Sequence, residues 1–247
     1  STQRNGQECG AICSAVTDLG SNNYRFNVSE FSNYSLAGAG ESCVNLSNTN
    51  TYQNKVVNVS GTYFINDDTI LCQDTYIVNG TAIIINASNI ELDCNGTTIN
   101  YSGGGEFGYG INVTNHNNTI IRNCLLNPNV QVADTIGVYI SEDLNCLIDN
   151  NTVTESDNNA DGIYISSSNC TISNNIISTS VWGTGTALTL ADADNSTVIN
   201  NAISENSIAS YGIYIFNTDS TRFINNSMFS RCLIKVSKLS CELQSSL

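Results

Sequence analysis

Three charged residues at one position of a repeating pattern are the strongest candidates for chemistry. Asp93, Arg122 and Asp149 occupy the same place in three consecutive repeats. Two carboxylates can act as general acid and base, and an arginine can hold a substrate carboxylate. As an active site, the row lacks a second residue nearby that could act as a base. As a structural ladder of ion pairs, it lacks nothing. We therefore predict a structural ladder, no catalytic residues and a protein that is not an enzyme.

Metal chemistry has little support. The single histidine, His116, lies alone in a polar stretch, and one Met and one His offer few copper ligands. Asp157, Asn159 and Asp161 precede a glycine as D-x-N-x-D-G, the first half of a calcium loop. Ser168 stands where the closing bidentate carboxylate would be needed. We expect no required cofactor, with calcium as the one ion to consider at this loop and a plain polar turn as the alternative.

Six repeats over residues 82–228 must position these side chains. Each opens with a small residue and continues with an alternating apolar strand, a loop, a second apolar strand and an Asn-rich bend. The opening residues step by 25 to 28 and are Ala82, Gly110, Gly137, Gly162, Ala187 and Gly212. Period-two alternation indicates strands, and such a repeat is typical of a solenoid whose units bury their apolar faces only by stacking.

Two files of Asn recur in phase with the strands. Asn tolerates left-handed backbone angles, and its amide can bond to the same amide one repeat away. The bend file is Asn95, Cys124, Asn151, Asn175, Asn201 and Asn226. The loop file is Asn89, Asn118, Asn145, Asn169 and Asn195. We expect both files to combine a backbone role with amide stacking.

The repeats resemble those of right-handed parallel β-helix proteins of the pectate-lyase-like class. The segment from Thr69 to Asn100, TILCQDTYIVNGTAIIINASNIELDCNGTTIN, resembles the first turn of archaeal and bacterial cell-surface members. The resemblance covers residues 56–230 and implies an all-β, right-handed parallel β-helix solenoid with a disulfide-bonded N-terminal cap and a short C-terminal cap. It implies function only loosely, because the same fold carries pectate lyases, polygalacturonases, phage tailspikes, adhesins and copper-site maturation proteins.

The chain divides into three expected regions. Residues 1–55, with irregularly spaced cysteines, read as an N-terminal cap or assembly arm, and residues 56–230 as the β-helix. Residues 231–247 read as a C-terminal cap or tail. Leu233, Val236, Leu239 and Leu243 have helix-like spacing in this tail, which favours a capping helix.

Ten cysteines without metal-type CxxC pairs favour an oxidising compartment, with stacked free thiols as the alternative. Cys146 and Cys170 share a repeat position in adjacent units, where a stacking distance of about 4.8 Å suits a disulfide. We predict that pair, a Cys72–Cys94 pair one unit apart, and a Cys232–Cys241 pair. Cys9, Cys13, Cys43 and Cys124 remain unassigned.

Fourteen Asn-X-Ser/Thr sequons occur, against about eight expected from the composition. The sites that we predict to be N-glycosylated are Asn27, Asn33, Asn45, Asn58, Asn79, Asn86, Asn100, Asn112, Asn117, Asn169 and Asn195. The remaining sequons begin at Asn95, Asn150 and Asn225. Some sequons fall on the repeated Asn files, which limits them if those side chains face inward.

Charge is uneven along a chain of net charge −14. Residues 56–221 hold 17 acidic residues against Arg122 alone, so the body repels nucleic acid and anionic polysaccharide. No apolar run approaches the ~20 residues of a membrane span. The last 26 residues are basic, and could meet the acidic body of another copy or simply form a capping segment.

An aromatic file lies between the buried positions of the first strand of each repeat. Its members are Tyr139, Tyr164, Thr189 and Tyr214, with Phe216 beside the last. Exposed rings can stack on sugars, pack against a neighbouring shaft, or stack on one another. We interpret the chain as a secreted, N-glycosylated structural or adhesive protein of the cell surface that self-associates as the subunit of a filament or coat. The rivals are a polysaccharide lyase or glycoside hydrolase, and a carbohydrate-binding shaft.

Overall fold

A computed structural model describes most of the chain. The described residues are 2–4, 7–8, 17–18, 24–25, 34–36, 43–46, 56–103, 105, 107–129, 134–156, 159–180, 185–206, 211–230 and 234–244. The chain forms two compact units, Ser1–Ser42 and Cys43–Leu247. The first contains an antiparallel sheet of order β2-β1-β5 and a separate β3-β4 pair. Its strands are β1 (Thr2–Arg4), β2 (Gln7–Glu8), β3 (Thr17–Asp18), β4 (Tyr24–Arg25) and β5 (Tyr34–Leu36).

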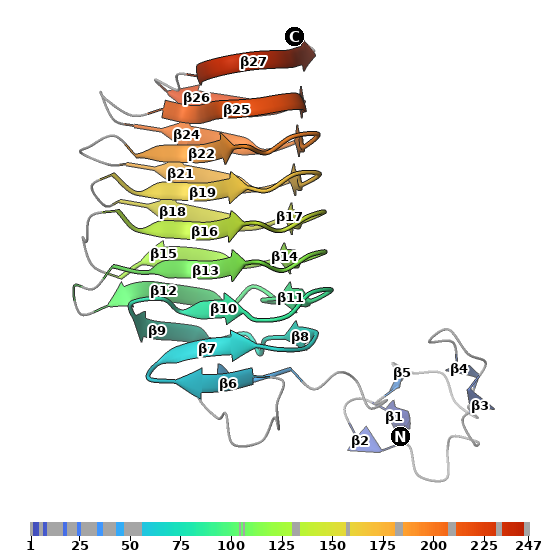
Figure 1. Ribbon diagram of the computed structural model, residues 1–247. Helices are drawn as coiled ribbons and strands as arrows, with labels where there is room; N and C mark the ends of the chain where they lie inside the picture. The colour runs from blue at the N-terminus through green and yellow to red at the C-terminus, as the bar shows by residue number, and fades with distance from the viewer. Residues whose placement is uncertain are drawn as a thin grey trace. The chain divides into compact units, whose positions relative to one another are not determined.

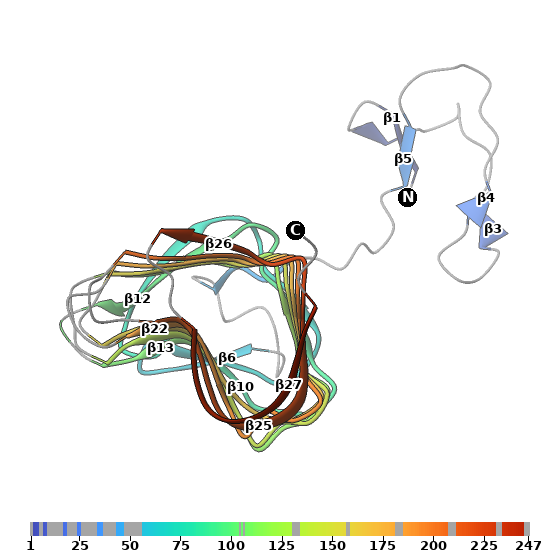
Figure 2. The ribbon, with the colours of Figure 1, turned by 90° about the horizontal axis from the view of Figure 1, so that it is seen from above.

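The second unit is a right-handed parallel solenoid in which each turn contributes one strand to each of three faces (Figures 1 and 2). The first face contains β7 (Thr62–Ile65), β10 (Ile83–Ile85), β13 (Tyr109–Thr114), β16 (Ile136–Ser141), β19 (Asp161–Ser166), β22 (Thr186–Ala191) and the start of β25 (Tyr211–Ile224). The second face contains β8 (Thr69–Ile70), β11 (Glu91–Asp93), β14 (Ile120–Arg122), β17 (Leu147–Asp149), β20 (Thr171–Ser173), β23 (Thr197–Ile199) and the end of β25. The third face contains β9 (Thr75–Asn79), β12 (Thr98–Gly103), β15 (Leu125–Pro128), β18 (Thr152–Glu155), β21 (Ile176–Thr179), β24 (Ala202–Glu205) and β26 (Ser227–Ser230).

The alternating pattern sets the register of neighbouring turns. Ile111, Val138, Ile163, Leu188 and Ile213 pair in sequence along the first face and are buried. A slip of one residue would turn each of these side chains outward, so burial fixes the stacking. The core is therefore a column of apolar layers, and each turn is stable only on its neighbours.

The small residues that open the repeats are required by close packing across the solenoid. A Cβ atom on Gly137 would lie 2.3 Å from Cγ1 of Val153 and 2.6 Å from the carbonyl oxygen of Gly162. A Cβ atom on Gly162 would lie 2.6 Å from the carbonyl oxygen of Ala187 and from Cγ2 of Ile177. The first and third faces are thus in close contact at this position.

Residues 43–46 belong to the solenoid. The first unit therefore ends at Ser42, and not at residue 55 as we expected. Val44 forms a parallel bridge with Leu71, and Leu46 is buried, with its backbone N–H donating to the Tyr76 hydroxyl at 3.2 Å. Strand β6 (Val56–Val59) then pairs antiparallel with β7. These contacts close the N-terminal end of the core.

The expected C-terminal capping helix is wrong. Residues Ile234–Gln244 form strand β27, which runs parallel to β25 as a further turn of the solenoid (Figure 1). Ile213 pairs with Ile234, and Ile215 pairs with Val236. The tail therefore continues the period-two register of the preceding turn, and this long-range pairing outweighs the local helix-like spacing of its apolar residues. Among the described residues, no helix is long and apolar enough to cross a membrane.

Candidate functional site

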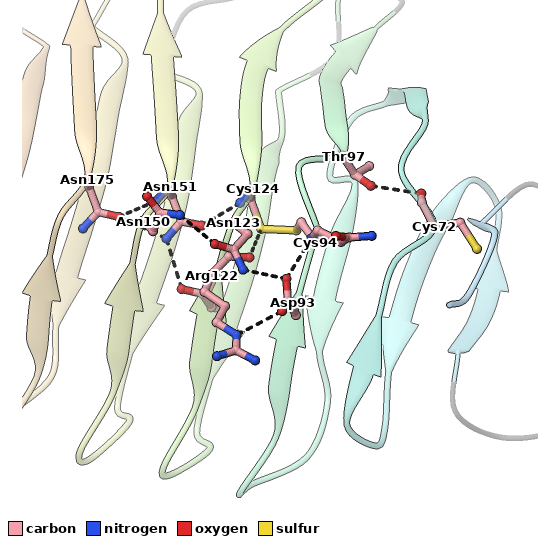
Figure 3. Close-up of a disulfide and its surroundings, with 12 residues drawn as sticks. Cys72, Asp93, Cys94, Thr97, Arg122, Asn123, Cys124, Asn150, Asn151 and Asn175 are labelled. Atoms are coloured by element: carbon pink, nitrogen blue, oxygen red, sulfur yellow. Dashed lines mark hydrogen bonds and ion pairs between the residues drawn. A yellow bond between two sulfur atoms is a disulfide. The ribbon is translucent and has the colours of Figure 1, made fainter. Parts of the chain in front are cut away.

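The structure brings Asp93, Arg122 and Asp149 into one register row, as predicted. The expected ladder of ion pairs is incomplete, because within the described residues Arg122 pairs with Asp93 and Glu91 and not with Asp149. Nε of Arg122 lies 3.1 Å from Oδ2 of Asp93 (Figure 3), and the same guanidinium pairs with Glu91. The row lies on the outward side of the second face, since Leu92, Ile121 and Ile148 occupy the inward positions. The pairing holds two acidic side chains to one cation and links β11 to β14.

The carboxylates of this row also accept hydrogen bonds from their own and the following turn. Oδ1 of Asp93 accepts from the side chain of Asn123 and the backbone N–H of Asn95, both at 2.8 Å (Figure 3). Oδ1 of Asp149 accepts from Ser173 at 2.6 Å and from the Asn174 amide at 2.7 Å. These contacts tie successive turns together.

The bend file contains a buried amide ladder. Nδ2 of Asn151 donates to Oδ1 of Asn175 at 3.1 Å, and Asn175 repeats this contact to Asn201 at 2.9 Å. Asn201 donates in turn to Asn226 at 3.0 Å. In the turn before the ladder this position is Cys124, whose backbone N–H donates to Oδ1 of Asn151 at 3.0 Å.

The left-handed backbone of the bend belongs to the neighbouring residue, not to the ladder Asn. Asn150, Asn174, Asn200 and Asn225 have φ between 50° and 57° and precede the ladder residues directly. The two roles that we assigned to one Asn are thus divided between the members of each Asn-Asn pair. Asn95, which we placed in this file, is exposed with φ of 50° and lies outside the ladder. The bend between β11 and β12 contains extra residues, and they displace Asn95 from the ladder position.

The backbone role that we predicted for the loop file is confirmed in all five residues, and amide–amide hydrogen bonds join three of them. All five of its residues have φ between 54° and 65° and all are exposed. Asn118 donates to Asn89 at 2.7 Å, and Asn145 donates to Asn118 at 3.1 Å. Asn169 and Asn195 continue the file on the outside of the solenoid, so their sequons are not directed into the core.

Among the described residues, three disulfides join adjacent turns, and the predicted Cys146–Cys170 bond is one of them, with a Cα–Cα distance of 4.5 Å. The predicted Cys72–Cys94 bond is wrong, since Cys72 pairs with Cys43 and Cys94 pairs with Cys124. Leu71, and not Cys72, occupies the inward position that corresponds to Cys94.

The two cysteines of the wrong pair therefore face opposite sides of the backbone. Cys94 is fully buried, whereas Cys72 is half-buried on the outer side. Cys9, Cys13 and Cys232 lie outside the described residues. The Cys232–Cys241 bond therefore stays a prediction.

The aromatic file stacks ring on ring. The ring centroids of Tyr139 and Tyr164 are 5.3 Å apart with planes inclined by 23°, and Tyr109 packs on Tyr139 at 5.0 Å. Thr189 continues the register but is buried. Beyond it, Tyr214 contacts Phe216 at 6.5 Å and also Tyr211. Burial raises the pKa of the Tyr164 hydroxyl.

Two members of the aromatic file were missed in the sequence. Tyr109 and Tyr211 lie at a different register position from Tyr139, since Tyr109 pairs with Ile136 and Tyr211 with Thr186. They reach the file only diagonally. A pattern search that follows one register position cannot detect such contacts.

The proposed calcium loop is only partly described. Asp157 lies outside the described residues, and Asn159 is exposed with φ of 56°. Asp161 accepts hydrogen bonds from the backbone N–H of Thr186 at 2.8 Å and from the Thr189 hydroxyl at 3.1 Å. Burial raises the pKa of Asp161 to about 6. Within the described ranges, no cluster of three His, Cys, Asp or Glu side chains could hold a metal ion.

Three fully buried acids, Asp143, Glu155 and Glu205, had no signal in the sequence. Asp143 is fully buried, and this burial raises its pKa to about 6 although the Thr119 hydroxyl acts in the opposite direction. Glu155 is also fully buried, where Oε2 accepts from the Thr135 hydroxyl at 3.1 Å and Oε1 accepts from the Tyr101 hydroxyl. His116 is half-buried in the loop between β13 and β14.

The sequons fall on several parts of the solenoid. Asn79, Asn86, Asn117, Asn169 and Asn195 are exposed. Asn45, Asn100 and Asn112 are half-buried, and Asn45 accepts from the Tyr76 hydroxyl at 3.3 Å. Asn58 lies in β6, while Asn27 and Asn33 lie outside the described residues.

Comparison with known proteins agrees with this architecture. Residues 109–243 match the family described as right handed beta helix region. The chain belongs to this family. The β-helix protein is also similar to the A-module of the mannuronan C-5 epimerase AlgE6 of Azotobacter vinelandii, with 13% identity and a TM-score of 0.36 over 66% of this chain. The chain spans 61% of that module's length. No curated protein matches the chain.

Proposed function

We propose that this β-helix protein is an extracellular structural or adhesive component of a cell surface, in which copies of the shaft associate in a filament or coat. The observation that carries the proposal is the occupation of the Asp93–Arg122–Asp149 row. Arg122 is held between Asp93 and Glu91, and Asp149 is held by Ser173 and Asn174. Side chains that bond to neighbouring turns in this way hold the turns of a structural protein together.

The bonds that join the turns support a load-carrying role outside the cell. Cys43–Cys72, Cys94–Cys124 and Cys146–Cys170 each join adjacent turns. Disulfides form and persist in oxidising compartments, and they limit unfolding of the chain between the linked residues. A shaft that must stay folded in the open environment benefits from both properties. N-linked glycans on the exposed sequons would belong to the same setting.

The aromatic file favours a scaffold over a glycan-binding surface. A sugar stacks on the face of an aromatic ring, but Tyr139 turns one face to Tyr109 and the other to Tyr164. Mainly the ring edges and hydroxyls are left for other contacts. The stack therefore adds to the cohesion of β13, β16 and β19.

Electron microscopy of the native protein with its glycans intact tests this function. Fibres or sheets with a regular axial repeat are the expected result. Isolated rods at every protein concentration would contradict assembly. A parallel assay on neutral and uronate polysaccharides, with Asp93→Asn as the matched control, tests catalysis. Cleavage or epimerisation by the native protein that Asp93→Asn loses would overturn the structural interpretation.

A further inference from the structure

The outer side of the third face carries no charged side chain among its described residues. The outward positions of β9, β12, β15, β18, β21, β24 and β26 hold only Thr, Ser, Asn, Ala, Ile, Leu and Phe. This is unexpected in a chain of net charge −14. The acids of the third-face strands, Glu155 and Glu205, point inward and are fully buried.

The same face collects exposed apolar side chains. Seven large hydrophobic residues are exposed in the described part of the chain, and four of them lie here, namely Ile77, Leu125, Ile176 and Phe229. Ile77 is 65% exposed and Ile176 is 54% exposed. Leu125 and Ile176 occupy one register position on either side of Thr152. Apolar side chains concentrated on one flat sheet indicate a contact surface.

The predicted glycans leave most of this face open. Its two sequon residues, Asn79 and Asn100, lie on β9 and β12 at the N-terminal end. No sequon Asn lies on β15, β18, β21, β24 or β26. A glycosylated chain would therefore still present five neighbouring strands without a sugar attached to them.

We infer that the third face, from β15 to β26, is the surface on which a second copy of this chain packs, sheet against sheet. Two copies of a strongly acidic chain repel each other wherever their acidic sides meet. Glu91, Asp93 and Asp149 lie on the outer side of the second face, and Asp161 lies on the first. When two copies approach through their third faces, no acidic side chains of one copy are brought against acidic side chains of the other.

The size of the surface predicts a weak pair. Five strands about 4.8 Å apart, with about four residues each at about 3.3 Å, present about 300 Å² of flat sheet per copy. Stable dimers bury more, and contacts of this size are transient. This inference deepens the proposed function and depends on it for the identity of the partner.

Sedimentation velocity over a wide range of protein concentrations tests the pairing on the full chain. The variant Leu125→Lys with Ile176→Lys places charge on the third face. The matched control, Ile120→Lys with Ile199→Lys, places it at outward positions of the second face. We expect a concentration-dependent dimer in the native protein and the control, strengthened by salt, and at least tenfold weaker pairing in the third-face variant. Circular dichroism checks that each variant is folded.

Each other outcome overturns the inference in a distinguishable way. Equal pairing by both variants would place the interface elsewhere. A native protein that stays monomeric but forms filaments under the microscope would refute the third face while the proposed function stands. A protein that does neither would refute both. The variant Ser178→Cys places a thiol on the third face. If a thiol reagent labels it slowly at every protein concentration, another part of the same chain covers the face.

Discussion

Asn151 and Asn175 form the centre of the amide ladder, with Nδ2 of Asn151 donating to Oδ1 of Asn175 at 3.1 Å inside the core. The same Oδ1 also accepts the backbone N–H of Asn151 at 2.9 Å. Both side chains are 1% exposed. One amide oxygen thus satisfies two buried donors of the preceding turn, which explains why this position is an Asn in four successive turns.

Removal of one ladder amide should destabilise the whole solenoid. Asn175→Ala deletes the acceptor for Asn151 and the donor to the carbonyl oxygen of Ile148. Buried polar groups left without partners cost about 1–3 kcal/mol each. We expect the free energy of unfolding in urea to fall by about 2–4 kcal/mol. Asn206→Ala, at an exposed position, is the control and should change it by less than about 0.5 kcal/mol.

Peptide mapping without reduction should recover three specific disulfide-linked pairs. The structure predicts linked peptides for Cys43 with Cys72 and for Cys94 with Cys124, besides the pair that contains Cys146. A linked peptide that joins Cys72 to Cys94 would contradict the inward position of Leu71. Replacing both Cys94 and Cys124 by Ala should lower the stability by about 2–4 kcal/mol, because that bond closes a long loop of the unfolded chain.

The repeat unit was readable from the sequence because its signal is local and recurs. The alternating apolar positions and the small opening residues identify the strands, and the left-handed loop file follows from Asn preferences. The Cys72–Cys94 error arose because the first turns differ in length at the bend, so sequence spacing did not reveal which residue faces inward.

Other features depend on the assembled solenoid. Tyr109 reaches Tyr139 only across registers, and Asp143 is buried only because the loops above and below enclose it. The tail 234–244 becomes a strand through its pairing with β25. Each of these contacts joins residues that are far apart in the sequence, so local spacing alone did not identify it.

A methyl group at the opening position should be costly in the middle of the solenoid. Gly137→Ala would place Cβ 2.3 Å from Cγ1 of Val153 and against backbone of the next turn. Overpacking of a rigid core costs about 1–3 kcal/mol. The reciprocal change, Ala187→Gly, removes a methyl at the same repeat position and should cost about 1 kcal/mol or less from backbone entropy. Thermal unfolding of both variants compares the two, and an equal effect would contradict the close approach at Gly137.

The two acids with raised pKa values should make the fold less stable as the pH rises. The pKa of Asp143 is about 6 in the folded protein against 3.8 for an ordinary Asp, and burial is the main cause. Between these values the folded state holds a proton that the unfolded state has released, so the free energy of unfolding decreases with increasing pH. The contribution is complete below about pH 4 and is lost as the pH passes through about 6. Asp161 acts in the same direction.

Asp143→Asn keeps the size of the side chain and removes the titration. We expect the variant to be more stable than the native protein at pH 7, where Asp143 must be buried as a charge, and to lose this advantage at pH 4. Urea unfolding at both pH values measures the difference. Asn206→Ala, at an exposed position without a titrating side chain, is the control and should leave the pH dependence unchanged. If the stability of the native protein rises from pH 4 to pH 7 by the same amount as that of Asp143→Asn, Asp143 does not bind a proton in a buried state.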